Sequence, residues 1–247
     1  MRLLRYLALT VTFLTSYPLF ADDLEAEKAI ELVKKGSVTR ATQLPGKPVA
    51  QILLNVSEAK DADLVHLRAF PQLETLGLSA TDVSDAGMKH VGACKKVKFL
   101  GLDQTDVTDK GLKDLAGIEN LVSLGLNQTG VTDAGIKELR VHKKLGYLSL
   151  LGTKITDAGA KELATFEQLR SIGLQWTEVS DVGVKELTKL KDLSQLSLDD
   201  TPITDESLKA LAGVESLYYL SLLRVKNITD EGVKDFQATL PKCKVVR

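Results

Sequence analysis

The chain repeats its own pattern every 24 residues, from about residue 49 to its C-terminal end. Two columns at this spacing hold leucine or isoleucine, and further columns hold threonine, aspartate and glycine. The two apolar columns are Leu76, Leu100, Leu124, Leu148, Ile172, Leu196 and Leu220, and then Leu78, Leu102, Leu126, Leu150, Leu174, Leu198 and Leu222. A register this regular predicts a stack of similar units, none of which can cover its own apolar face alone.

The repeating unit reads L-x-x-L-x-L-x-x-T-x-V-T-D-x-G-x-x-x-L and resembles the leucine-rich repeat, with threonine in place of the more familiar asparagine or cysteine. It is similar to the short-helix repeats of exported bacterial proteins and to the cysteine-containing repeats of F-box substrate receptors. The resemblance implies an α/β solenoid over residues 49–247, a right-handed superhelix with a parallel concave sheet and short helices on the convex side. The shared residues of this family build the scaffold, and its binding residues vary from member to member.

Each column has an expected physical role. The two leucines of L-x-L point into the core because side chains alternate along a strand. The threonine hydroxyl is expected to bond backbone groups of the turn just past the strand, and Ser/Thr-Asp is expected to cap a helix. Glycine two residues later leaves room for that helix to lie close to the strands. A row of aspartates could also bind calcium, but helix capping already accounts for it.

The segments outside the repeats have different patterns. Residues 1–21 have the order of a secretory signal peptide, with basic residues, a short apolar run and a small residue before the cut. The apolar run is shorter than the roughly 20 residues that span a bilayer, which disfavours an uncleaved membrane anchor. Residues 22–48 are predicted to form an N-terminal capping helix (22–36) and a connecting turn (37–48). At the other end, Pro241 should end the last helix, and residues 244–246 should form an edge strand.

Candidate chemistry is sparse, and we predict no catalytic, cofactor-binding or metal site. The formal net charge of −1 argues against nucleic-acid binding. Cys94 and Cys243 are expected to be free packing residues, because about six strand spacings separate them. His66 and His90 share one helix position but lack the further ligands that zinc needs. His142 falls in an apolar packing column.

Binding is expected at the variable positions of the concave sheet. Glycine and serine fill its central column, so the floor is nearly bare, and larger residues stand on either side. The candidate binding residues are Phe99, Tyr147, Leu151, Trp176, Tyr219, Leu223 and Arg224. Tryptophan, tyrosine and arginine often anchor interfaces, although the same residues could be half-exposed spacers. The last repeat carries an extra residue, which is either a capping irregularity or part of the binding surface.

These observations predict an exported, monomeric, non-enzymatic module that binds a protein or peptide, with a glycan as the other ligand class. The first alternative is a structural protein of the cell envelope with no discrete ligand. The second, a ubiquitin-ligase substrate receptor, is disfavoured by the signal peptide and the missing F-box. After signal cleavage no membrane span is expected.

Overall fold

The computed structural model describes residues 35, 37–40 and 49–247 of the chain. The predicted signal peptide, residues 1–21, lies outside the described residues, as does the predicted capping helix over 22–36 apart from Lys35. The connecting turn expected over 37–48 is wrong at its start, where Ser37–Arg40 forms a strand. Its Val38 and Thr39 are β-branched and pair antiparallel with Ile52 and Gln51. The proline and glycine signals behind the turn prediction all fall at residues 45–48, which are outside the described part.

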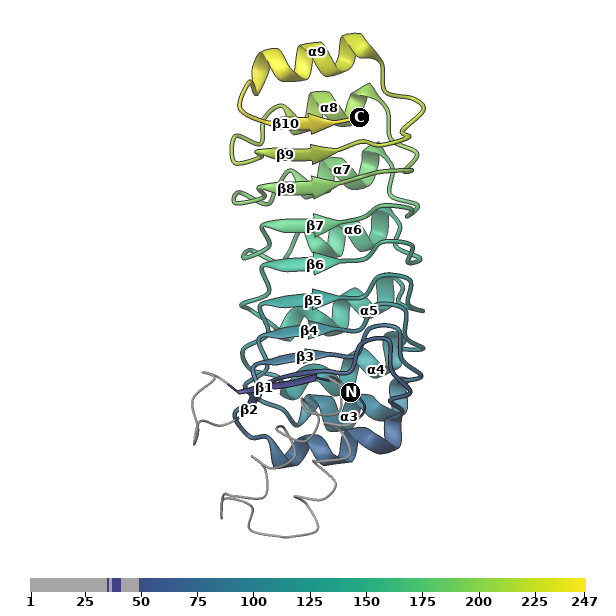
Figure 1. Ribbon diagram of the computed structural model, residues 1–247. Helices are drawn as coiled ribbons and strands as arrows, with labels where there is room; N and C mark the ends of the chain where they lie inside the picture. The colour runs from purple at the N-terminus through teal and green to yellow at the C-terminus, as the bar shows by residue number, and fades with distance from the viewer. Residues whose placement is uncertain (1–34, 36, 41–48) are drawn as a thin grey trace, which may run out of the picture.

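The described strands form one sheet in sequence order, and every pair from β2 onward is parallel (Figure 1). Adjacent strands pair in the register of the 24-residue repeat, for example Leu148 opposite Ile172. The strands are β1 Ser37–Arg40, β2 Val49–Leu53, β3 Thr75–Gly77, β4 Phe99–Gly101, β5 Ser123–Gly125, β6 Tyr147–Ser149, β7 Ser171–Gly173, β8 Gln195–Ser197, β9 Tyr219–Ser221 and β10 Lys244–Val246.

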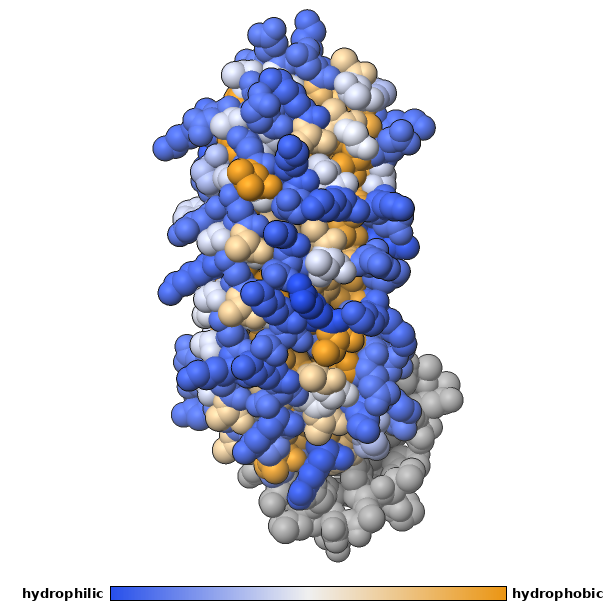
Figure 2. Space-filling model, turned by 180° about the vertical axis from the view of Figure 1, so that it is seen from behind, coloured by the Kyte–Doolittle hydropathy of each residue, from blue (hydrophilic) through white to orange (hydrophobic). Residues whose placement is uncertain are grey.

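A short helix follows each strand from β2 to β9 and returns the chain to the next strand. The helices are η1 Asp61–Ala69, α3 Asp85–Gly92, α4 Asp109–Asp114, α5 Asp133–Glu138, α6 Asp157–Leu163, α7 Asp181–Leu187, α8 Asp205–Leu211 and α9 Asp230–Thr239, with 3₁₀ turns η2 Leu115–Gly117 and η3 Leu139–Val141 after α4 and α5. In Figure 1 the strands lie in front of α6, α7 and α8. Seen from behind, the molecule is mostly hydrophilic, with broken strips of hydrophobic residues (Figure 2). This arrangement confirms the predicted solenoid.

The core lies between the sheet and the helices. Both leucine columns are buried along the whole stack, as are the branched residues that precede the helices, such as Val131 and Ile155. The predicted threonine bonds are present, since each hydroxyl donates to the carbonyl three residues earlier at 2.5–2.7 Å, as Thr129 does to Leu126. Cys94 and Cys243 are free thiols packed against the core, as expected.

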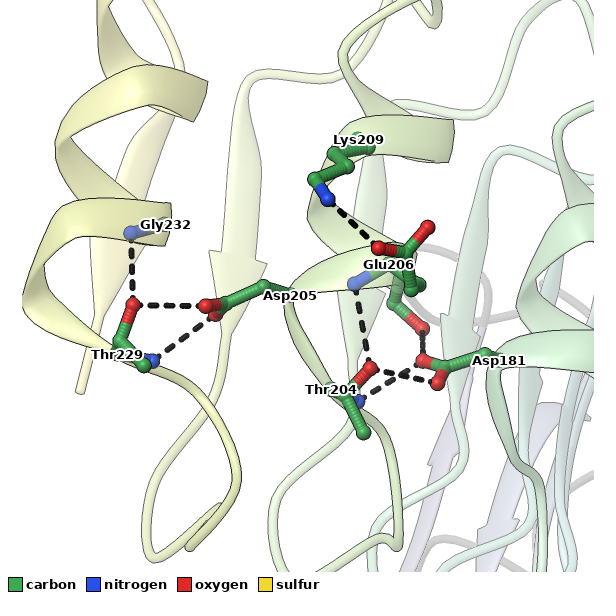
Figure 3. A network of polar contacts seen from close by, with 8 residues as sticks. Asp181, Thr204, Asp205, Glu206, Lys209, Thr229 and Gly232 are labelled. Carbon is green, nitrogen blue, oxygen red and sulfur yellow. Dashed lines mark hydrogen bonds and ion pairs between the residues drawn. The ribbon is translucent and has the colours of Figure 1, made fainter.

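The aspartate column joins neighbouring repeats, which corrects the capping role expected for it. From α3 to α8 the N-cap is the preceding Ser or Thr, whose hydroxyl accepts from the backbone two residues on, as Thr204 does from Glu206. In α9 the N-cap Thr229 accepts from Gly232, and η1 begins after Lys60. Each aspartate instead reaches the N-cap residue of the next repeat, accepting its N–H at 2.7–2.9 Å and its hydroxyl at 2.6–2.7 Å. Figure 3 shows two such pairs, Asp181 with Thr204 and Asp205 with Thr229. We call this contact the inter-repeat latch.

The C-terminal end closes as the sequence predicts. Helix α9 ends at Thr239, before Pro241, and β10 pairs with β9 over Lys244–Val246. Arg247 forms an ion pair with Asp230 and donates to the carbonyl of Ile228, which ties the last strand to the start of α9. In the extended last repeat, buried Val225 takes the place of the usual threonine.

Candidate interaction surface

The side of the sheet that faces away from the helices, which we call the sheet face, has a floor of small residues. The central column of β3 to β9 contains only glycine and serine: Gly77, Gly101, Gly125, Ser149, Gly173, Ser197 and Ser221. Side chains just beyond the strand ends lie over part of this column, since a Cβ atom on Gly77, Gly125 or Gly173 would come within 2.7–2.9 Å of Asn55, Asp103 or Gln175. The floor is therefore low but partly covered, and Gly77, Ser149 and Ser221 are buried between two rows of larger side chains.

Three aromatic candidates lie in the first row, at the start of their strands. Phe99 on β4 and Tyr147 on β6 are 48% and 44% exposed, whereas Tyr219 on β9 is half-buried. Phe99 and Tyr147 are separated by two strand spacings, about 10 Å. A fourth aromatic residue, Tyr218, is 51% exposed, and its hydroxyl bonds the amide of Gln195. Tyr218 is not among the residues predicted from the sequence, because it precedes the alternating strand positions by one residue.

The remaining candidates lie in the second row, just beyond the ends of the strands. Leu151 and Leu223 are half-buried, while Trp176 is 61% exposed and Arg224 is exposed. The two rows are about 13 Å apart, since four residues of extended chain separate Tyr147 from Leu151. The predicted residues thus share one face but form two rows rather than a single cluster.

Within the second row the structure brings Trp176, Asp200 and Arg224 together. The Cζ atom of Arg224 lies 5.8 Å from the ring centroid of Trp176, within cation–π range. The same guanidinium pairs with Asp200, with Nε 2.9 Å from one carboxylate oxygen. Hydrogen bonding to Asp200, followed by its charge, raises the pKa of Arg224. This set of three side chains is called the Trp176 cluster below.

The backbone has a left-handed conformation at the repeat position that Trp176, Asp200 and Arg224 share. The φ angle lies between 53° and 67° in each described repeat, as at Trp176 (58°) and Gly152 (67°). Residues other than glycine and asparagine are uncommon there, and a bulky one is an outlier. Leucine periodicity gives no signal of this conformation, so sequence reasoning missed it.

Polar side chains of the second row brace the strand ends. Asp103, Asn127 and Asp199 each accept the N–H of the residue 24 positions later at 2.8–2.9 Å. Asp199 and Asn127 also accept the hydroxyls of Ser221 and Ser149. The carboxylates of Asp103 and Asp199 therefore have a structural role, and they also place negative charge beside the floor.

Among the described residues, the other candidate groups do not come together in a site. Among the described residues no group of three or more His, Cys, Asp or Glu is placed to hold a metal ion. No helix in the described part of the chain is both long and apolar enough to cross a membrane. His142 is buried as predicted, and its Nδ1 lies 3.1 Å from the carbonyl of Ile118. Burial raises the pKa of both cysteine thiols to about 11, so neither is activated as a nucleophile.

Comparisons with known proteins agree on the fold. A sequence profile described as Leucine Rich repeat matches residues 189–212. An internalin, inlF, from Listeria monocytogenes has a similar structure, with a TM-score of 0.59 at 17% identity over 91% of this chain and 74% of that one. Internalin C2, inlC2, of the same organism gives a TM-score of 0.52 at 20% identity, over 70% of this chain and 80% of that chain. A search of curated proteins found no match.

Proposed function

We propose that this leucine-rich repeat protein is an exported, non-enzymatic module that binds a protein partner through its sheet face. The observation that carries the proposal is the exposure of Phe99, Tyr147 and Trp176 on a face whose floor is otherwise glycine and serine. Large aromatic side chains gain most from burial in an interface, and here the fold does not bury them.

The rigidity of the stack supports this role. Every repeat is tied to the next by backbone pairing and by an inter-repeat latch, so the two rows are held in place before a partner arrives. A surface that is already ordered loses little conformational entropy on association. The internalin-like fold supports, by analogy, both export and a role as a binding scaffold. The signal-peptide pattern of residues 1–21 also supports export.

The proposal is tested by capture with matched variants. Immobilised wild-type protein and the variants Tyr147→Ala and Trp176→Ala are exposed to the extracytoplasmic fraction of the producing organism. Val182→Ala is the control, because Val182 is 65% exposed but lies on α7, on the helix side. A partner retained by wild type and Val182→Ala but lost by the sheet-face variants is the expected result. Equal retention by all variants with unchanged melting temperatures would reject sheet-face binding.

A further inference from the structure

We propose that the partner segment that docks on the sheet face is basic, and that it places a lysine or arginine side chain against Trp176. This inference rests on the proposed function and specifies the chemistry of the partner. It follows from the environment of Trp176 and the charges of the face.

Trp176 does not contribute to the core. Its side chain is 61% exposed, and its backbone is held at φ 58°. Large residues are disfavoured in this conformation, and such strain is often found at functional sites. Other repeats fill the same position with smaller or polar residues, such as Ala80, Gln104 and Asp200. Because neither packing nor backbone geometry favours tryptophan here, a ligand is the simplest reason for it.

The space beside Trp176 is open on its N-terminal side. The neighbouring repeat has Gly152 at the equivalent position, and the Gly152 N–H pairs with the carbonyl of Gln175. Gly152 has no side chain, and the adjacent Leu151 is half-buried. On the C-terminal side, Asp200 and Arg224 complete the Trp176 cluster. A partner side chain can therefore approach the indole from the side of Gly152.

The charge of the sheet face favours a cationic side chain of the partner. From β3 to β9, the floor and the two rows carry Asp103, Asp199 and Asp200 but no lysine. The single basic residue among them, Arg224, is already paired with Asp200. Lys98 and Arg170, at the repeat position that Tyr218 occupies, are likewise paired, with Glu74 and Asp192. The whole chain is nearly balanced, with 32 basic and 33 acidic residues, so the shortage of cations belongs to this face. Carboxylates accept hydrogen bonds only, and an aromatic face attracts cations, so both favour lysine or arginine.

The test uses the fluorescence of Trp176, the only tryptophan in the chain. The full protein is titrated with a short peptide of alternating lysine and glycine, with its glutamate–glycine counterpart, and with a neutral oligosaccharide. We expect a saturable change with the lysine peptide only. Its affinity should fall about tenfold on going from low to high salt, because exposed charges are screened.

Variants identify the groups responsible, with binding followed by calorimetry. Trp176→Ala should weaken the lysine peptide about tenfold, which corresponds to about 1.4 kcal/mol. Asp199→Asn keeps an oxygen that can accept the Leu223 N–H but removes the charge, and should weaken binding several-fold. The control Glu215→Gln removes an exposed charge before β9 and should leave the affinity unchanged.

Binding of the glutamate peptide or the oligosaccharide in preference to the lysine peptide would overturn the proposal, as would no binding of any probe. Neither result would decide the proposed function. That function is tested separately, by whether wild type captures a partner that Tyr147→Ala fails to capture, and this test assumes nothing about charge. An affinity for the lysine peptide that is equal in wild type, Trp176→Ala and Asp199→Asn would also overturn the proposal.

Discussion

The carboxylate of Asp181 accepts two hydrogen bonds from Thr204, the residue that caps the helix of the next repeat. The backbone N–H lies 2.8 Å from Oδ1 and the hydroxyl lies 2.7 Å from Oδ2. Desolvation, the largest effect, raises the pKa of Asp181, but bonds from Ser207 and Thr204 together outweigh it and lower that pKa. The same latch recurs along the stack, so it couples the stability of each repeat to its neighbour.

Removing one latch should destabilise the whole stack. Asp181→Ala leaves the N–H and hydroxyl of Thr204 without their acceptor, and we expect the free energy of unfolding to fall by about 2–3 kcal/mol. Urea denaturation measures the change. Asp106→Ala, which removes an exposed carboxylate, should cost less than about 0.5 kcal/mol. Equal effects of the two substitutions would mean that the latch does not stabilise the stack.

The glycine column should reject alanine because of this same carboxylate row. A Cβ atom on Gly183 would lie 2.5 Å from Asp157 Oδ1, which also accepts the Gly183 N–H. Gly183→Ala should lower stability by about 2 kcal/mol although alanine favours helices. The control is Gly213→Ala, where the nearest atom is 3.9 Å away. Thermal unfolding that shows no difference between the two variants would contradict the close packing.

Stability should fall in mild acid because of His142. Burial is the main cause that lowers its pKa below 6.5, and its Nε2 has no hydrogen-bond partner among the described residues. The unfolded chain therefore binds a proton more readily, and stability is lost as the pH falls below about 6.5. Arg140, Lys143 and Glu167 line the hollow next to His142.

His142→Leu should remove this part of the pH dependence, since leucine and isoleucine occupy the same column at Leu190 and Ile118. Between about pH 7.5 and pH 5.5, wild type should lose more of its free energy of unfolding than the variant. Denaturant unfolding at both pH values measures the difference. Parallel pH dependences would show that His142 is not the titrating group.

Trp176 should carry a stability cost that binding offsets. Trp176→Gly relieves the left-handed strain of about 1–2 kcal/mol but adds chain entropy of about 0.5–1 kcal/mol in the unfolded state. The variant should therefore unfold at the same temperature as wild type or higher, while losing its partner. A marked fall in melting temperature would mean that Trp176 serves the fold.

The repeat period was sufficient to predict the architecture. Each column of leucines lies where the alternation of strand side chains places it, and α9 and β10 were anticipated from Pro241 and the apolar residues after it. The strand at Ser37–Arg40 was missed because it is short and lies next to strong turn signals.

The parts that sequence could not predict depend on contacts between repeats. The aspartate row looked like local capping because Asp181 follows Ser180, and only the stacking shows that it bonds Thr204 in the next repeat. The candidate residues of the sheet face were chosen by column alone. The pairing of Trp176 with Arg224 depends on the left-handed turn after each strand.

The most direct test of partner binding through the sheet face is site-specific photo-crosslinking. A photoreactive amino acid is placed at Tyr147 in one protein and at Val182, on the helix side, in another. We predict that the captured partner is crosslinked from position 147 and not from position 182. Crosslinking from position 182 alone would contradict the account.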